Sequence, residues 1–569
     1  LNAEGKATIT SLSNPAVQFR GAVLVRAGGD GASAELQGQI REGSFSANQL
    51  QASAGAVNAD ANLNLTIGRF VFQNSTQATR DGGGAITVAG DVSARSVALG
   101  ATSSITLRTY MGYISIGGSL TASALLGNTT SNPATKISIG AGAGRLTASG
   151  DAQTLDYGAV TGYGAVNIAG DVRVSSAGYG ANAELEIFSV GSTLTLGSGL
   201  DLIAAGTRST VNAHLAAHAG PDVAISTFIA TANLNIAGAV RLEASGAGAS
   251  TNLEIVADQG RVSLGKGIDV IASGADAHAA FSVNNLKDSI DVNGDLTLAA
   301  TAAGSDSHLT VTTAASPISV HGSITAIASG TGSEASATLQ STSAAVSITE
   351  NISVAALGEA SHADLILRQG AGNDVNVNGM ISISADSSVG TAAGATATAD
   401  LQLGKLSNAP INLFLDAIQQ DDSVSVSLKL LQDGGHAQLG SSGHAGTASL
   451  TLSEKTSAAN QLLDAIDIGF TGSSGKAILE FGADQDSTSE AAIQRVLIKG
   501  FRIGQDELHF DGLVGVTTTA RTLDGFINLA LNHFNTGAST GTPSTQFTVA
   551  DVLVGGNDSA TYLAYDHDG

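Results

Sequence analysis

Apolar and polar residues alternate along most of the chain in short segments that recur at a period of about 28 residues. The repeat is clearest between Asn233 and Gly372, where five units follow one another without an insertion. Each unit has six apolar positions grouped in three pairs, and the residue inside each pair is usually polar. Such alternation is typical of β-strands with one buried face. The pattern therefore predicts three short strands per unit.

The apolar positions keep their character from unit to unit. In the first unit they are occupied by Leu234, Ile236, Val240, Leu242, Leu253 and Ile255. Glycine recurs between the first two strands and at a second bend, which in the first unit are Gly238 and Gly246. Glycine suits turns because it has no side chain to resist unusual backbone angles.

A unit of this length is too short to enclose its own core, so it must bury its apolar positions against neighbouring units. A coil of strand, turn, strand, bend and strand achieves this, because equivalent strands then stack in parallel at about 4.8 Å per coil. Tandem antiparallel hairpins are the alternative, but their usual Asn-Gly or Asp-Gly turns do not recur here. We therefore predict an all-β chain, a parallel β-helix or three-strand solenoid.

The pattern changes near Ser453, where larger side chains and helical spacing replace the small-residue repeat. Short helices are expected around Leu462 to Ile466 and Ala491 to Leu497, and an amphipathic helix at Thr522 to Phe534. We expect a parallel β-solenoid over residues 1–452 and a small α+β domain over 453–569 that covers its last strand edge. The first residues have the pattern of a continuing coil, so further solenoid or another chain is expected before Leu1.

Composition and charge narrow the function classes. The formal net charge of −24 opposes nucleic-acid phosphates and anionic lipid, so neither is expected as a partner. There is no run of 18 apolar residues, and hence no transmembrane segment is predicted. Cysteine is absent, which excludes disulfides and thiol catalysis.

Two phrases near the C-terminus carry a family resemblance. Residues 498–513 read IKGFRIGQDELHFDGL, and after the expected amphipathic helix the chain ends in VLVGGNDSATYLAYDHDG. In order and spacing, this last part of the chain resembles the C-terminal domain of type I-secreted bacterial proteins of the RTX class. The matching residues are Phe501, Gly504, Asp506, Leu508, Phe510, Asp558, Tyr562, Asp566, Asp568 and Gly569.

The resemblance implies export in one step to the exterior, with an uncleaved C-terminal signal. We predict no N-terminal signal peptide, and this expectation and the absence of cysteine agree with the resemblance. The chain departs from that class in lacking its calcium-binding glycine-aspartate nonapeptide array, and in stopping at Gly569, where that class usually continues with a final strand. The character of the solenoid repeats is also similar to that of large bacterial adhesins. An extracellular location at the bacterial cell surface is therefore expected.

Candidate catalytic residues do not converge in the sequence. Polysaccharide lyases and hydrolases built on β-helices need carboxylates, or a metal and a base, presented by adjacent coils. Here Asp and Glu are scattered over outward positions, so no enzymatic activity is expected. His278 and His362 share a column, but three coils, or about 14 Å, separate them, which is too far for one metal ion.

Calcium is the one candidate ligand, because acidic loops in an extracellular setting are typical sites for hard cations. The first candidates are Asp506, Asp511, Asp566 and Asp568, and the second choice is Asp421 and Asp422. The alternative is that these acidic residues serve solubility.

Together these features predict a secreted structural protein, a building block of a surface layer, a filament or a biofilm adhesin. Self-association is expected through Ser/Thr-rich lateral faces or end to end. The alternative is a β-helical polysaccharide-active enzyme or a glycan-binding protein. That class needs a groove lined by aromatic residues and carboxylates, and only 4% of the chain is aromatic.

Overall fold

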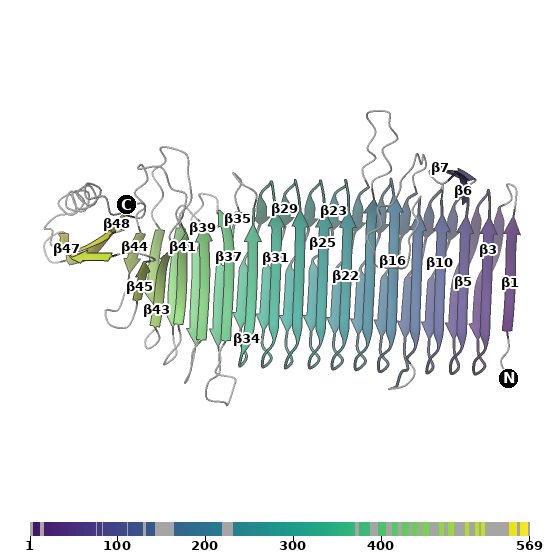
Figure 1. The fold of residues 1–569 in the computed structure, drawn as a ribbon, viewed down its shortest axis with the longest axis horizontal. Coiled ribbons are helices and arrows are strands. Elements are labelled where there is room, and N and C mark those ends of the chain that lie inside the picture. The colour runs from purple at the N-terminus through teal and green to yellow at the C-terminus, as the bar shows by residue number, and fades with distance from the viewer. Residues whose placement is uncertain are drawn as a thin grey trace.

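In a computed structural model the chain winds into an elongated coil whose strands form two long parallel sheets (Figure 1). The structure describes residues 4–386, apart from 12–15, 75–76, 82, 111, 129–131, 143–163, 219–231, 370–374 and 380, and strands alone from 397 to 566. The solenoid of about 28 residues per coil predicted from the sequence is confirmed.

One face of the coil is a sheet of 17 parallel strands, called sheet A below. Each coil contributes one long strand to it, and neighbouring coils pair in register. The strands are β1 (Glu4–Ser11), β3 (Ser33–Ile40), β5 (Asp60–Ile67), β10 (Thr102–Thr109), β13 (Ala134–Ala141), β16 (Asn182–Val190), β19 (Thr210–His218), β22 (Ser250–Ala257), β25 (His278–Asn285), β28 (Asp306–Thr313), β31 (Glu334–Ser341), β34 (Ser361–Arg368), β37 (Ala397–Lys405), β39 (Val424–Leu431), β41 (Thr447–Ser453), β43 (Lys476–Gly482) and β45 (Glu507–Phe510).

The opposite face, sheet B, has 26 strands because most coils add two short strands to it. A typical pair is β20 (Leu234–Ile236) and β21 (Val240–Ala244), separated by the bend at Gly238. Such pairs recur from β8 (Ile86–Val88) and β9 (Val92–Ser96) to β35 (Val375–Val377) and β36 (Ile381–Asp386). The first two strands of sheet B, β2 (Val17–Ala27) and β4 (Phe45–Ala54), are instead long and continuous. Each regular unit therefore holds the three strands expected.

The core lies between the two sheets and runs without interruption along the described coils. All six apolar positions of the first unit are buried, with 0–2% of each residue exposed. Most buried apolar residues form one connected cluster from Val23 to Ile383. Small residues such as Ala244 and Ala249 line the inner face next to the bend, where the two sheets meet.

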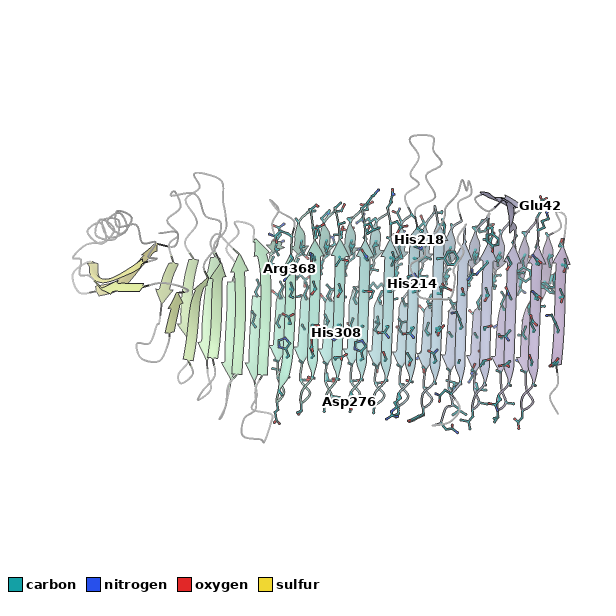
Figure 2. All side chains as sticks on the ribbon, in the orientation of Figure 1. Glu42, His214, His218, Asp276, His308 and Arg368 are labelled. Atoms are coloured by element: carbon teal, nitrogen blue, oxygen red, sulfur yellow. The ribbon has the colours of Figure 1, made fainter. Side chains whose placement is uncertain are left out.

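The bend that leads from sheet B into sheet A has a left-handed residue in ten coils. Its backbone φ lies between 52° and 65° in each of Gly31, Asn58, Gly100, Gly180, Arg208, Gly248, Asp276, Gly304, Gly332 and Ala360. Figure 2 shows Asp276 among these bends, which follow one another along the lower edge of the molecule in that view. L-residues with a side chain pay about 1–2 kcal/mol for this conformation. The column therefore carries strain wherever it is not glycine.

Exchanging glycine and alanine within this column tests the strain. A Cβ on Gly332 would meet no atom within 4 Å, so the only cost of Gly332→Ala is the left-handed backbone conformation of an alanine. This change should reduce the free energy of unfolding by about 1 kcal/mol. Ala360→Gly should raise it by about 0.5 kcal/mol, since relief of strain is partly offset by the greater freedom of unfolded glycine. Urea unfolding of both variants measures the effect, and unchanged midpoints would contradict the proposed strain.

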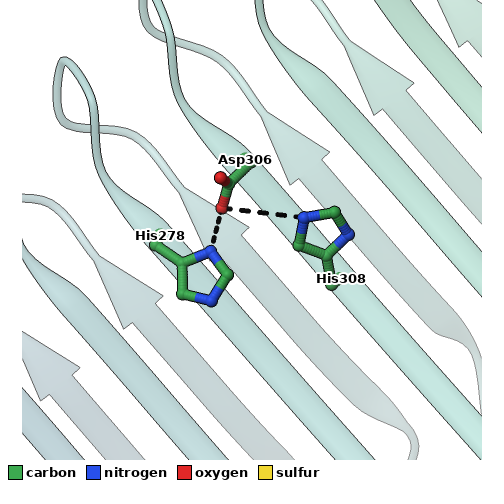
Figure 3. Close-up of side chains that lie close together, drawn as sticks. All are labelled: His278, Asp306 and His308. Carbon is green, nitrogen blue, oxygen red and sulfur yellow. Dashed lines mark hydrogen bonds and ion pairs between the residues drawn. The ribbon is translucent and has the colours of Figure 1, made fainter.

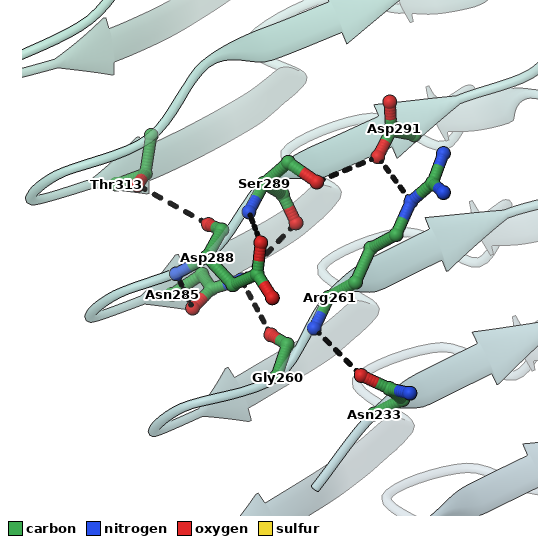
Figure 4. Close-up of polar contacts among 8 residues, drawn as sticks. All are labelled: Asn233, Gly260, Arg261, Asn285, Asp288, Ser289, Asp291 and Thr313. Carbon is green, nitrogen blue, oxygen red and sulfur yellow. Dashed lines mark hydrogen bonds and ion pairs between the residues drawn. The ribbon is translucent and has the colours of Figure 1, made fainter. Parts of the chain in front are cut away.

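The turn that leaves sheet A is held by a buried side chain, Asn285, at the end of β25 (Figure 4). Its Nδ2 donates to the carbonyl oxygens of Gly260, one coil back, at 2.8 Å and of Ser289 at 3.2 Å. Its Oδ1 accepts from the backbone N–H groups of Lys287 and Asp288, both at 3.2 Å. One side chain thus satisfies polar backbone groups in two successive coils.

Replacing Asn285 with alanine should reduce the free energy of unfolding by about 1–3 kcal/mol, because the buried carbonyl of Gly260 loses this donor. Asn284→Ala is the matched control, since Asn284 is exposed on the same strand and its loss should change stability by less than about 0.5 kcal/mol. Urea unfolding compares the two variants. Equal midpoints would show that the side chain does not hold the turn.

The two sheets continue beyond residue 452, where the sequence predicts a change of domain. Sheet B includes β42 (Ile466–Thr471) and β44 (Val496–Lys499), while β43 and β45 extend sheet A. The short helices expected at 462–466 and 491–497 are therefore wrong at their C-terminal ends, which lie in strands. The alternation of Ile466, Ile468 and Phe470 suits a half-buried strand, and it outweighs the weaker helical spacing before it.

A separate three-stranded sheet follows, made of β46 (Val514–Thr517), β47 (Gln546–Val554) and β48 (Asp558–Asp566). The last two strands are antiparallel. The amphipathic helix expected at Thr522 to Phe534 lies outside the described residues.

Candidate metal centre

Ion pairs on the outward face of sheet A join neighbouring coils. His214 Nδ1 lies 3.1 Å from Glu254 Oε2, and Lys136 Nζ lies 3.0 Å from Glu184 Oε2. Burial raises the pKa of the Glu184 carboxyl, but hydrogen bonds from Lys136 and Asn182 and the charge of Lys136 outweigh it, so its pKa lies below the usual value. These contacts are available because in-register stacking brings outward side chains of successive coils together.

Three of these outward side chains converge on β25 and β28. His278 stands directly opposite Asp306 in the register of the two strands, and His308 follows two residues after Asp306 on the same face of β28. His278 Nδ1 forms a hydrogen bond with Asp306 Oδ1, and His308 Nε2 lies 3.9 Å from that oxygen (Figure 3). The two imidazole centroids are 5.5 Å apart.

The three potential ligand atoms, one from each residue, all lie within 4.8 Å of one another. Among the residues that the structure describes, this is the one group of three or more His, Asp or Glu side chains close enough to hold a metal ion. Between 36% and 38% of each side chain is exposed, so the group faces solvent rather than the core. Two imidazoles and a carboxylate can share protons or coordinate a divalent cation.

A fourth residue orients one of the imidazoles. Ser336, on the next strand β31, hydrogen-bonds through its Oγ to Nδ1 of His308. Its strand is the neighbour of β28 on the side away from His278. The contact occupies one ring nitrogen and leaves Nε2 as the nitrogen that faces Asp306.

The sequence interpretation considered His278 but missed its partners. The register confirms that His278 and His362 lie in one column, three strands apart. The partners of His278 are instead an aspartate one coil away and a histidine two residues beyond that aspartate. The repeat period applied to every potential ligand would have found the group, because Asp306 stands one period after His278.

The calcium candidates are placed only in part. Asp566 ends β48 opposite Gln546, while Asp506, Asp511 and Asp568 lie outside the described residues, as do Asp421 and Asp422. Calcium binding by these residues stays a prediction.

Comparisons of the chain with protein-family models, with curated proteins and with solved structures found no match. In the part of the chain that the structure describes, no helix has the length and apolar character needed to cross a membrane.

Proposed function

We propose that the protein is a secreted structural rod, a building block of an extracellular assembly such as a surface layer, a filament or a biofilm adhesin. The observation that supports this most is the unbroken stack of strands: 17 successive strands of sheet A pair in parallel, over a core that is continuous from Val23 to Ile383. At about 4.8 Å per strand the stack is about 80 Å long.

Backbone hydrogen bonds between the coils make such a stack resist bending and extension. Each coil donates and accepts hydrogen bonds with the coil before and after it, so the load is shared by many parallel bonds. Outward contacts such as Lys136–Glu184 add bonds between coils. The resemblance of the C-terminal region to type I-secreted proteins supports the extracellular location. Self-association of the rods would then build the assembly.

Negative-stain microscopy of the purified chain tests this proposal. We expect rods about 80 Å long that associate into ordered filaments or sheets as the concentration rises. Sedimentation velocity over the same concentrations gives an independent measure of association. A species that stays monomeric at every concentration, with and without calcium, would contradict the assembly role.

Calcium is proposed to act through the C-terminal aspartates. Changing Asp506, Asp511, Asp566 and Asp568 together to asparagine should abolish calcium binding measured by calorimetry, because carboxylate oxygens are the preferred ligands. A control variant removes two charges elsewhere, with Asp201→Asn and Asp269→Asn on sheet B, and should keep the calcium binding of the wild type. Equal calcium binding by the wild type and the C-terminal variant would reject these four residues as ligands.

A further inference from the structure

We propose that His278, Asp306 and His308 form a binding site for a divalent metal ion that prefers imidazole ligands, such as zinc. The observation is the convergence of two imidazole nitrogens and one carboxylate oxygen within 4.8 Å on the outward face of sheet A. The proposal does not depend on the role of the rod.

The backbone places the three ligands without help from a loop. His278 and Asp306 face each other across two paired strands, and Asp306 and His308 are alternate residues of one strand, so all three side chains project from the same face. Donor atoms around a tetrahedral zinc ion lie about 3.3 Å apart, given bonds of about 2.0–2.1 Å. No pair of donors therefore needs to close by more than about 1.5 Å, which rotation of partly exposed side chains can supply.

The Ser336 contact supports a metal site independently of the ligand distances. Histidines that bind metals almost always hydrogen-bond through the ring nitrogen that is not the ligand, which fixes the orientation of the ring. Here Nδ1 of His308 is held by Ser336 and Nε2 faces Asp306. Glu334 follows Asp306 in the same column on β31 and adds negative charge to this part of the surface.

The ligand set selects the class of metal. Imidazole suits zinc, copper, nickel and iron, whereas calcium takes six to eight oxygen ligands, which this site does not offer. Three protein ligands leave a coordination position for water or for a group from another molecule. Because the ligands come from two successive coils, a bound metal would cross-link β25 to β28 and stabilise that part of the stack.

Titration with Zn²⁺ by calorimetry, and with Co²⁺ by visible absorption, tests the site on the whole chain. The wild type should bind one ion per chain more tightly than any remaining surface sites, with a Co²⁺ spectrum that Zn²⁺ removes and excess Ca²⁺ does not. His278→Ala and His308→Ala should each abolish this event. Ser336→Ala should weaken it about tenfold, since it removes only the contact that orients His308.

His214→Ala is the matched control, because His214 lies on the same face of sheet A and pairs with a single carboxylate, Glu254. It should leave the tight event unchanged. Urea unfolding without metal shows whether each variant is folded, so that loss of binding is not confused with loss of structure. The proposal is overturned if His278→Ala and the wild type bind Zn²⁺ with equal affinity and stoichiometry, or if Ca²⁺ displaces Co²⁺.

Discussion

Hydrogen bonding between successive coils is the interaction on which the rest of the structure depends. It sets a spacing of about 4.8 Å between equivalent strands. The apolar core then excludes a shift by one residue, because such a shift would turn the buried face outward. Every position of the repeating unit therefore becomes a column along the molecule. Apolar columns such as Leu234 and Val262 form the core, and polar columns form two outward faces.

The fold could be predicted from the sequence because its main signal is repeated. Five units without an insertion define which positions are buried, and all six predicted columns of the first unit are. The left-handed column at the bend could not be read in the same way, because Gly248, Asp276 and Ala360 share a backbone conformation and no side-chain property. Near residue 466 the repeat weakens, and the helical spacing there predicts a helix where the chain begins β42.

The candidate site was harder to predict because it belongs to no column. His278 and Asp306 share one, but His308 stands in the next outward column of β28, so the group crosses the repeat diagonally. The orientation of His308 depends in addition on Ser336, from a third coil. A period identifies residues with the same environment, whereas a site needs different residues that meet. Applying the period to every potential ligand brings His278 and Asp306 together, whereas the ring orientation of His308 is seen only in the structure.

Insertions in the coil show why a site of this kind can persist on the strands. Thr210 pairs with Ser250, well over one period further along, yet β19 and β22 keep the register of sheet A. After β5 the inserted residues include the hairpin of β6 (Arg69–Asn74) and β7 (Gln77–Asp81), and β5 still pairs with β10 in register. Loops carry function in most folds because the scaffold beneath them is rigid. In this coil the turns absorb changes in length, while the strands hold outward side chains at fixed distances. Chemistry that needs two coils at once is therefore best placed on the strands, as at His278 and Asp306.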